Sequence, residues 1–336
     1  MSWMAKSPLE WGPPPGPVGR PMAIVRRGRY ISLLSLLSLA FLCLRSEPPP
    51  DGDHGVLARF QRRRNRLEHV CSEYNDTMRT EREALFGNTP INTCTNTFFT
   101  VNYREFAICN VLKGGSLSWK EFFLYYNLPS TFLQDCQRSG TCPTRLHGRL
   151  AQVRHPFERL LSSWRHIFHS GGWRLLESRF VEDPGLAAEF EATYENITWP
   201  VFVRDLVLRT GGPVPDMQDY DTPGVWIRHH WAPYWLTCGV CSSQALPDYI
   251  LNLETMEEDI VTLFEKEFMM FGEDYLFPRV KTLGTKNKVG DQNPDNLIET
   301  YFGQLSKAEV LGLYQLYHVD FQLFGYSPEL YLQQAK

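Results

Sequence analysis

The hydrophobic pattern of the chain alternates between short apolar runs, typical of buried strands, and longer stretches with apolar residues at helical spacing. Residues 106–111, 150–153 and 248–253 are apolar runs that predict strands. The clearest helical stripe consists of Phe157, Leu160, Leu161, Trp164, Ile167 and Phe168. Strands that alternate with helices in this way predict an α/β fold with a central, mainly parallel sheet flanked by helices.

Local signals mark where several helices begin. Ser118-Trp119-Lys120-Glu121 has the spacing of a capping box, and Ser306-Lys307-Ala308-Glu309 repeats it before the apolar positions of a later helix. Pro156 suits the first position of the helix that carries the stripe. Residues 71–104 carry turn chemistry, including Gly87-Asn88-Thr89-Pro90, and lead into the first predicted strand, whereas residues 127–148 are rich in loop residues.

The N-terminal segment indicates a membrane anchor. A tail over residues 1–29 ends in a cluster of arginines, and residues 30–44 form an apolar run. A cleaved signal peptide is the alternative, but no small-residue cleavage site follows the run. The basic flank predicts a type II orientation, with residues 45–104 as a lumenal stem and N-terminal region, and residues 105–336 as the lumenal catalytic domain.

Charge and sequons bear on the partners and the compartment. The net charge of −4 argues against a general nucleic-acid-binding protein. The arginines between residues 59 and 66 lie on a predicted amphipathic helix, where we expect a solvated face, with contact to an anionic acceptor or a membrane as the alternative. Sequons at Asn75 and Asn196 are compatible with a secretory lumen.

The cysteines favour disulfides over a metal site. Cys238 and Cys241 have CxxC spacing, but no second such pair or histidine pair stands at metal-ligand spacing, so we expect no metal. A structural disulfide that involves one or both of them is expected instead. Cys136 and Cys142, six positions apart, are a second candidate pair.

Two stretches could bind an anion. Lys113-Gly114-Gly115-Ser116 follows a predicted strand and precedes a predicted helix, and a helix N-terminus beside a lysine can hold a phosphate or a sulfate. The alternative is a simple Gly-Gly turn. Arg154 follows another strand, where ligands of α/β sheets bind, although it could equally be a surface arginine. Ser162 lies off the apolar stripe of the next helix.

Both stretches resemble motifs of the membrane-bound Golgi carbohydrate sulfotransferases. Cys109 to Lys120, CNVLKGGSLSWK, is similar to the family's segment for the 5'-phosphosulfate of PAPS, 3'-phosphoadenosine 5'-phosphosulfate. It departs at Leu112, where proline is usual, and at Leu117, where threonine is usual. Arg154 to Ser162, RHPFERLLS, resembles the family's motif for the 3'-phosphate.

Three later blocks extend the resemblance over roughly residues 105–330. They are His230-Trp231 followed by Cys238-Gly239-Val240-Cys241, the run Leu253 to Asp259, and the closing segment Tyr314 to Tyr326. The resemblance implies a P-loop-like sulfotransferase fold, PAPS as the co-substrate and no metal. The implied PAPS-binding residues are Lys113, Gly114, Gly115, Ser116, Leu117, Ser118, Trp119, Arg154 and Ser162.

Sulfuryl transfer to a sugar hydroxyl requires stabilisation of the leaving oxygen and benefits from a general base. We expect Lys113 to supply the first and His230 the second, with His155, His229 and Glu254 as alternatives for the base.

The resemblance also implies a place in the Golgi membrane and a glycan or proteoglycan acceptor, with O4 of N-acetylgalactosamine favoured over O3 of glucuronate. We expect residues 170–230 and 282–296 to form loops that select it. A non-catalytic lumenal glycan-binding protein, motivated by Leu112 and Leu117, is the main alternative. A nucleotide-sugar glycosyltransferase is a third.

Overall fold

A computed structural model describes ten parts of the chain: residues 54–86, 96–109, 111–125, 129–132, 145–172, 197–209, 230–241, 246–266, 268 and 294–336. The expected tail and anchor, Cys136, Cys142 and His229 lie outside these residues. Within the described parts, no helix has both the length and the apolar character needed to cross a bilayer.

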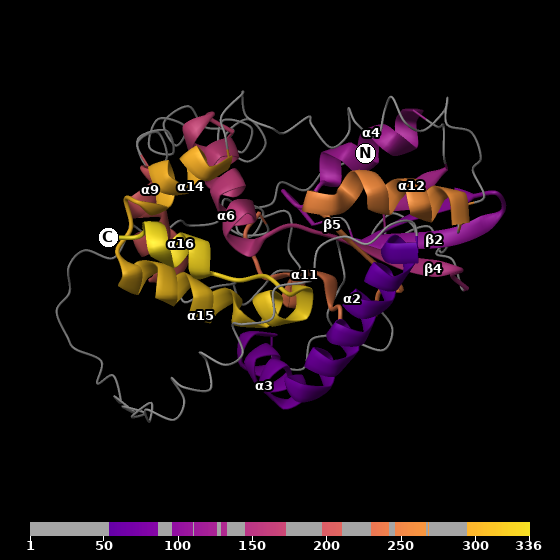
Figure 1. Cartoon of the computed structure of the whole chain (residues 1–336), viewed down its shortest axis with the longest axis horizontal. Coiled ribbons are helices and arrows are strands. Elements are labelled where there is room, and N and C mark those ends of the chain that lie inside the picture. Colours follow the sequence, from indigo (N-terminus) through magenta and orange to yellow (C-terminus); the bar gives the residue numbers. More distant parts are fainter. Residues whose placement is uncertain are drawn as a thin grey trace, which may run out of the picture. The chain divides into compact units, whose positions relative to one another are not determined.

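A five-stranded sheet organises the described residues, in the order β3-β1-β2-β4-β5 (Figure 1). The strands are β1 (Asn96–Val101), β2 (Arg104–Cys109), β3 (Ser130–Phe132), β4 (Gly148–Val153) and β5 (Tyr249–Asn252). Only β1 runs against its neighbours: it is antiparallel to β2 and β3, whereas β2, β4 and β5 pair in parallel. The predicted α/β class with a mainly parallel sheet is therefore confirmed.

Helices occupy most of the remaining described residues. In chain order they are α2 (His54–Glu73), α3 (Asn75–Phe86), α4 (Ser116–Tyr125), α6 (Pro156–Trp164), α9 (Trp199–Val201), α11 (Tyr234–Cys238), α12 (Met256–Lys266), α14 (Pro294–Phe302), α15 (Lys307–Phe324) and α16 (Glu329–Gln334). Two of these continue as wider π-helical turns, α6 into η1 (Arg165–His169) and α9 into η2 (Phe202–Leu208). A short 3₁₀ turn, η3 (Leu253–Thr255), joins β5 to α12.

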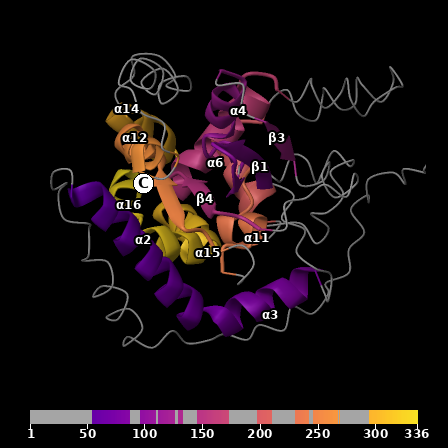
Figure 2. The same ribbon diagram turned by 90° about the vertical axis from the view of Figure 1, so that its right-hand side faces the viewer.

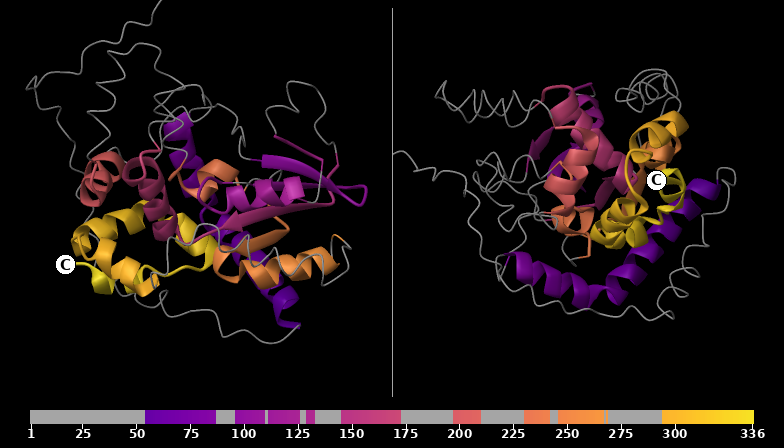
Figure 3. Two further views of the ribbon diagram at one scale, coloured as in Figure 1. Left: turned by 90° about the horizontal axis from the view of Figure 1, so that it is seen from above. Right: turned by 90° about the vertical axis from the view of Figure 1, so that its left-hand side faces the viewer.

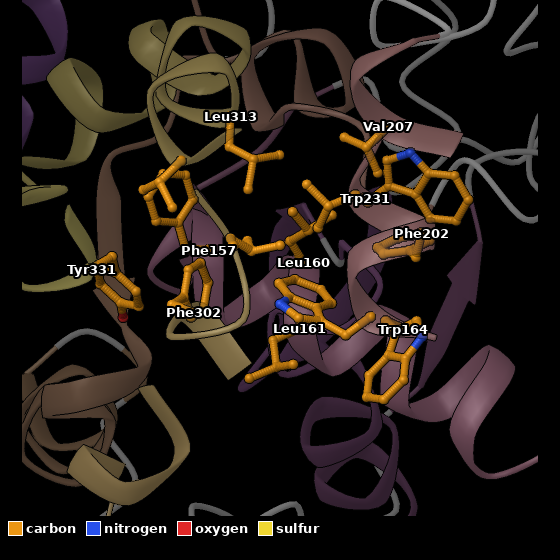
Figure 4. Packing of buried hydrophobic residues seen from close by; sticks show 14 of the residues in the cluster. Phe157, Leu160, Leu161, Trp164, Phe202, Val207, Trp231, Phe302, Leu313 and Tyr331 are labelled. Atoms are coloured by element: carbon orange, nitrogen blue, oxygen red, sulfur yellow. The ribbon is translucent and has the colours of Figure 1, made fainter. Parts of the chain in front are cut away.

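The predicted stripe of α6 and η1 forms the centre of the largest hydrophobic cluster. All six of its residues are buried, and they pack against Phe202 of η2, Phe302 of α14 and Tyr331 of α16 (Figure 4). The C-terminal helices therefore gather around α6, as the yellow ribbons in Figure 3 show. Pro156 occupies the first turn of α6, as its fixed backbone angle favours.

The arginines of helix α2 were expected on a solvated face, but two of them are buried. The helix packs against α15, β5 and α12 (Figure 2). Arg59 and Arg63 are buried, and both donate hydrogen bonds to the fully buried carboxylate of Asp259 in α12. Opposite charges removed from water together compensate each other, so this face of α2 belongs to the protein interior.

Several local predictions were wrong. Residues 71–104, where the sequence indicated turns, also contain α3 and the inner strand β1, and β3 lies within the segment expected to be loop-rich, 127–148. Helix α4 begins at Ser116, so Ser118 lies inside its first turn and is not the cap. Residues 199–208, expected within an acceptor loop, are helical. The capping box at Ser306 and Glu309 is confirmed.

Candidate functional site

Three parallel strands end at one edge of the sheet, and the candidate residues follow them. The loop with Lys113 comes after β2, Arg154 comes after β4, and Glu254 comes after β5. Ligands of parallel sheets bind at this edge, where the helices after the strands begin. The fold thus brings together two stretches that lie about forty positions apart in the sequence.

The loop after β2 has the backbone geometry of an anion cradle. Lys113 has a φ of 66° and Gly115 a φ of 112°, both in the left-handed region, and α4 begins at the next residue. Such turns direct successive backbone N–H groups toward one point, and the first turn of a helix adds N–H groups without intrahelical acceptors. The loop therefore offers donors for a phosphate or a sulfate.

Close packing explains both glycines of the loop. A Cβ atom on Gly114 would lie 2.6 Å from the Tyr234 hydroxyl oxygen, and one on Gly115 would lie 2.9 Å from Cγ of Gln152. Gln152 is buried in β4 and accepts a hydrogen bond from the Trp119 indole at 3.3 Å. Trp119, an expected PAPS-binding residue, is itself 1% exposed, so its side chain anchors α4 on the sheet.

Lys113 supplies the positive charge of the loop from a partly buried position, which disfavours the charged form. Burial, followed by the nearby charge of Arg154, lowers its pKa to about 8. No carboxylate pairs with Lys113 among the residues that the structure describes. A buried cation in such a place favours an incoming anion, which would restore the usual pKa.

The guanidinium of Arg154 is oriented by α6. Its Nε donates to Glu158 at 3.2 Å, and its backbone N–H donates to the Tyr234 hydroxyl at 3.1 Å. In the described part of the chain, its two terminal nitrogens have no acceptor. These contacts fix Arg154 through Nε and the backbone, so its two terminal nitrogens can bind a phosphate as a fork.

Arg159 of the same motif has a structural role. It is fully buried and donates to the Leu112 carbonyl at 3.1 Å and to the Ala232 carbonyl at 2.7 Å. Its guanidinium also lies over the Tyr234 ring, 4.7 Å from the centroid. Arg159 thus ties the loop after β2 to the segment before α11.

The CxxC cysteines are bonded to other elements. Cys238 pairs with Cys109 at the end of β2, and Cys241 pairs with Cys71 of α2. The expected involvement of this pair in disulfides is confirmed.

At the other end of α11, the buried carboxylate of Asp320 accepts the N–H groups of Tyr234 and Trp235, at 2.7 and 3.1 Å.

His155 and Glu254, two alternatives for the base, have partners within the protein. His155 accepts the Phe157 N–H at Nδ1, and its Nε2 donates to the Ser327 carbonyl. Burial lowers its pKa to about 4, so it caps α6 in the neutral state. Glu254 accepts hydrogen bonds from the His155 N–H and the Tyr326 hydroxyl.

His230 lies in the segment before α11 and is 2% exposed. Its carbonyl accepts a hydrogen bond from Ser163 of α6 at 2.6 Å, and its ring stacks on that of His166, with centroids 6.0 Å apart. Burial, and after it the charge of Lys113, lowers the pKa of His166. His166 is not among the residues expected from the sequence; its only sequence signal is its place four residues after Ser162.

The other expected residues are placed less fully. Ser116 and Ser162 are partly exposed at the start of α4 and on α6, and the side chains of Leu117 and Ser118 lie outside the described residues. No group of potential metal ligands occurs among the residues that the structure describes.

Comparisons with known proteins identify the family. The profile of the sulfotransferase family matches residues 96–327. Carbohydrate sulfotransferase 10 of Xenopus laevis is 25% identical over 275 residues, which cover 70% of this chain and 68% of that protein. The protein of the same name from Danio rerio is 24% identical over 306 residues (81% and 76%).

Carbohydrate sulfotransferase 8 of Homo sapiens is 23% identical over 303 residues, which are 82% of this chain and 65% of that protein. No solved structure matches the chain.

Proposed function

This chain belongs to the sulfotransferase family, and from that premise we propose that it transfers a sulfuryl group from PAPS to a hydroxyl of a glycan. The proposal rests on one observation: Lys113 and Arg154 lie at the same edge of the sheet, beside the N-terminus of α4. Two separated cations and a helix start fit a nucleotide with phosphates at both its 5' and 3' positions.

Each end of the nucleotide would have its own binding group. The loop N–H groups, with Lys113, Gly114, Gly115 and Ser116, would hold the 5'-phosphosulfate. Arg154, oriented by Glu158, would bind the 3'-phosphate together with Ser162. Leu117, Ser118 and Trp119 would belong to the segment that binds the 5'-phosphosulfate. Lys113 would stabilise the charge that develops on the oxygen between phosphate and sulfate as that bond breaks.

The names of the relatives support a carbohydrate acceptor. They are carbohydrate sulfotransferases 8 and 10, so a carbohydrate hydroxyl is the proposed acceptor group here. We propose O4 of N-acetylgalactosamine in a glycan or proteoglycan as the acceptor. The base would be His230, as expected from the sequence, or its ring neighbour His166. The enzyme would act in the Golgi lumen, anchored through residues 30–44 as a type II membrane protein.

Sulfate transfer tests the proposal directly. Purified full-length chain would be incubated with radiolabelled PAPS and a panel of chondroitin, desulfated dermatan, terminal N-acetylgalactosamine and glucuronyl acceptors. We expect label on one acceptor. We also expect Lys113→Ala and Arg154→Ala to abolish transfer, while Arg62→Ala and Lys307→Ala, at exposed positions, leave it unchanged. Wild-type activity in both site variants would contradict the proposal.

The alternative is a non-catalytic glycan-binding protein, favoured by Leu112 and Leu117. Titration calorimetry with the product nucleotide, 3'-phosphoadenosine 5'-phosphate, separates the two, because the alternative expects no binding. Although residue 112 is not a proline, the loop is still fixed at this position, because Arg159 donates a hydrogen bond to the Leu112 carbonyl.

A further inference from the structure

His166 is a histidine beside the candidate site with no assigned role. It lies in the π-helical segment η1, which continues α6. Single π-helical turns within α-helices are frequent at functional sites because they redirect side chains. The residues of α6 that are not buried, Glu158 and Ser162, lie on one face, and His166 follows Ser162 by four positions.

A ring contact with His230 and two hydrogen bonds of Arg159 link His166 indirectly to the loop with Lys113. Its ring stacks on His230, with an angle of 25° between the planes. The segment that contains His230 is tied to the loop, because Arg159 donates to both the Ala232 and Leu112 carbonyls. Lys113 directly follows Leu112, and its charge acts on His166. The three groups thus form one cluster, with Lys113, His166 and His230 as its titratable members.

Exposure separates the two histidines of the cluster. His230 is 2% exposed, whereas His166 is partly exposed. An acceptor hydroxyl must come within about 3 Å of the base that takes its proton. His166 is therefore the more accessible of the two histidines to an approaching sugar.

We propose that His166 is the general base of sulfuryl transfer, with the buried His230 supporting its ring. This inference rests on the proposed function. His166 would take the proton of the acceptor hydroxyl at a ring nitrogen while the hydroxyl oxygen forms a bond to the sulfur of PAPS. The bond from sulfur to the phosphate oxygen breaks, and its electron pair stays on that oxygen beside Lys113. The products are the sulfate ester, 3'-phosphoadenosine 5'-phosphate and a proton on His166.

The environment suits a base at neutral pH. Burial and Lys113 both disfavour the imidazolium and lower the pKa of His166 below the ordinary ~6.5. A base with a lowered pKa stays neutral as the pH falls toward that value. We therefore expect kcat to be flat near neutrality and to decline only in more acidic solution.

Variants of three histidines test the inference in the full-length chain. We expect His166→Asn to lower kcat by about 100-fold or more, to remove the acidic decline of kcat, and to change the affinity for 3'-phosphoadenosine 5'-phosphate less than twofold. His169→Asn, in the exposed part of the same π-helical segment, is the matched control and should keep wild-type kcat. His230→Phe, which keeps an aromatic ring beside His166, should lower kcat less than His166→Asn does.

The outcomes distinguish the two proposals. Transfer by the wild type and by His166→Asn at similar kcat would overturn this inference alone, as would loss of activity in His230→Phe only. A wild type that transfers no sulfate to any acceptor would overturn the proposed function and this inference with it.

A measurement on the wild type guards against misfolded variants. Diethyl pyrocarbonate modifies accessible neutral histidines, and loss of transfer should parallel modification of His166, as located by mass spectrometry. Full activity with His166 modified would also overturn the inference.

Discussion

At the scale of single residues, Lys113 combines a left-handed backbone with a weakened hold on its proton. A non-glycine residue in that region costs roughly 1–2 kcal/mol. Burial of a charge without a counter-ion adds to the cost. Unfavourable local states of this kind persist where a ligand uses them.

The charge of Lys113 predicts a pH dependence of nucleotide binding. Its pKa of about 8 means that the cation is complete below pH 8 and is lost as the pH rises through that value. We expect the affinity for 3'-phosphoadenosine 5'-phosphate to fall by up to about tenfold for each pH unit above 8. Titration calorimetry between pH 6.5 and 9.5 measures it. Lys113→Arg stays charged and should flatten the curve; an equally flat wild-type curve would contradict the assignment.

The contact between Gly114 and Tyr234 predicts a rescue. An added methyl group would lie 2.6 Å from the Tyr234 hydroxyl, so Gly114→Ala should displace the loop and weaken nucleotide binding by at least about tenfold, because overpacking costs roughly 1–3 kcal/mol. Removal of the hydroxyl in Gly114→Ala/Tyr234→Phe should restore part of the affinity. If the double variant binds more weakly than Gly114→Ala, the contact does not limit the loop.

At the scale of elements, α11 depends on a carboxylate from α15. The helix has five residues, too few to be stable alone. Asp320 accepts two of its first N–H groups, and α11 in turn places Tyr234 against Gly114 and Arg154. The distant helix α15 thereby positions the site.

We expect Asp320→Asn to lower the free energy of unfolding by roughly 1–3 kcal/mol, because the amide NH₂ replaces one of two acceptors and leaves a buried N–H without a partner. Urea denaturation measures the loss. Glu329→Gln, at an exposed position of α16, should change stability little. Burial raises the pKa of Asp320 from 3.8 to about 6, so the wild type loses stability as the pH rises between these two values. The difference between the variant and the wild type should therefore shrink over that range and stay constant above it.

Elements with a strong local pattern could be predicted from the sequence, and elements defined by distant partners could not. The stripe of α6 and the capping box of α15 are complete within one segment. Strand β1 has no regular alternation, and its place between β2 and β3 is fixed by pairing. The burial of Arg59 depends on Asp259, 200 positions away.

The same distinction applies to the candidate site. Lys113 and Arg154 follow strands, so the topology alone brings them to one edge. His166 is a candidate because of its neighbours His230 and Lys113, which are distant in the sequence. A histidine on the polar side of a helix does not indicate a functional site by itself.

At the scale of the whole molecule, the folded part extends beyond the segment that matches the family. Helix α2 precedes residue 96, where the match begins, yet its arginines neutralise Asp259 in the interior. We propose that the catalytic unit includes α2.

Arg63 tests that proposal. Removal of one partner from a buried ion pair leaves an uncompensated charge, so we expect Arg63→Met to destabilise the protein by roughly 3–5 kcal/mol. Arg62→Met, on the exposed side of the same helix, should change stability by less than about 0.5 kcal/mol. Thermal and urea denaturation compare the two. Equal stability of the two variants would show that α2 is dispensable for the fold.

The disulfides of Cys238 and Cys241 have a consequence for the order of folding. Each bonds to a partner more than one hundred positions earlier, at separations of 129 and 170 residues. While the chain is being oxidised, the nearest thiol to either cysteine is the other one, three positions away, and short loops close faster than long ones. An early bond between the two would have to be exchanged for the final pair through mixed-disulfide intermediates. Maturation of this protein should therefore depend on a disulfide isomerase, and its yield should rise when one is supplied.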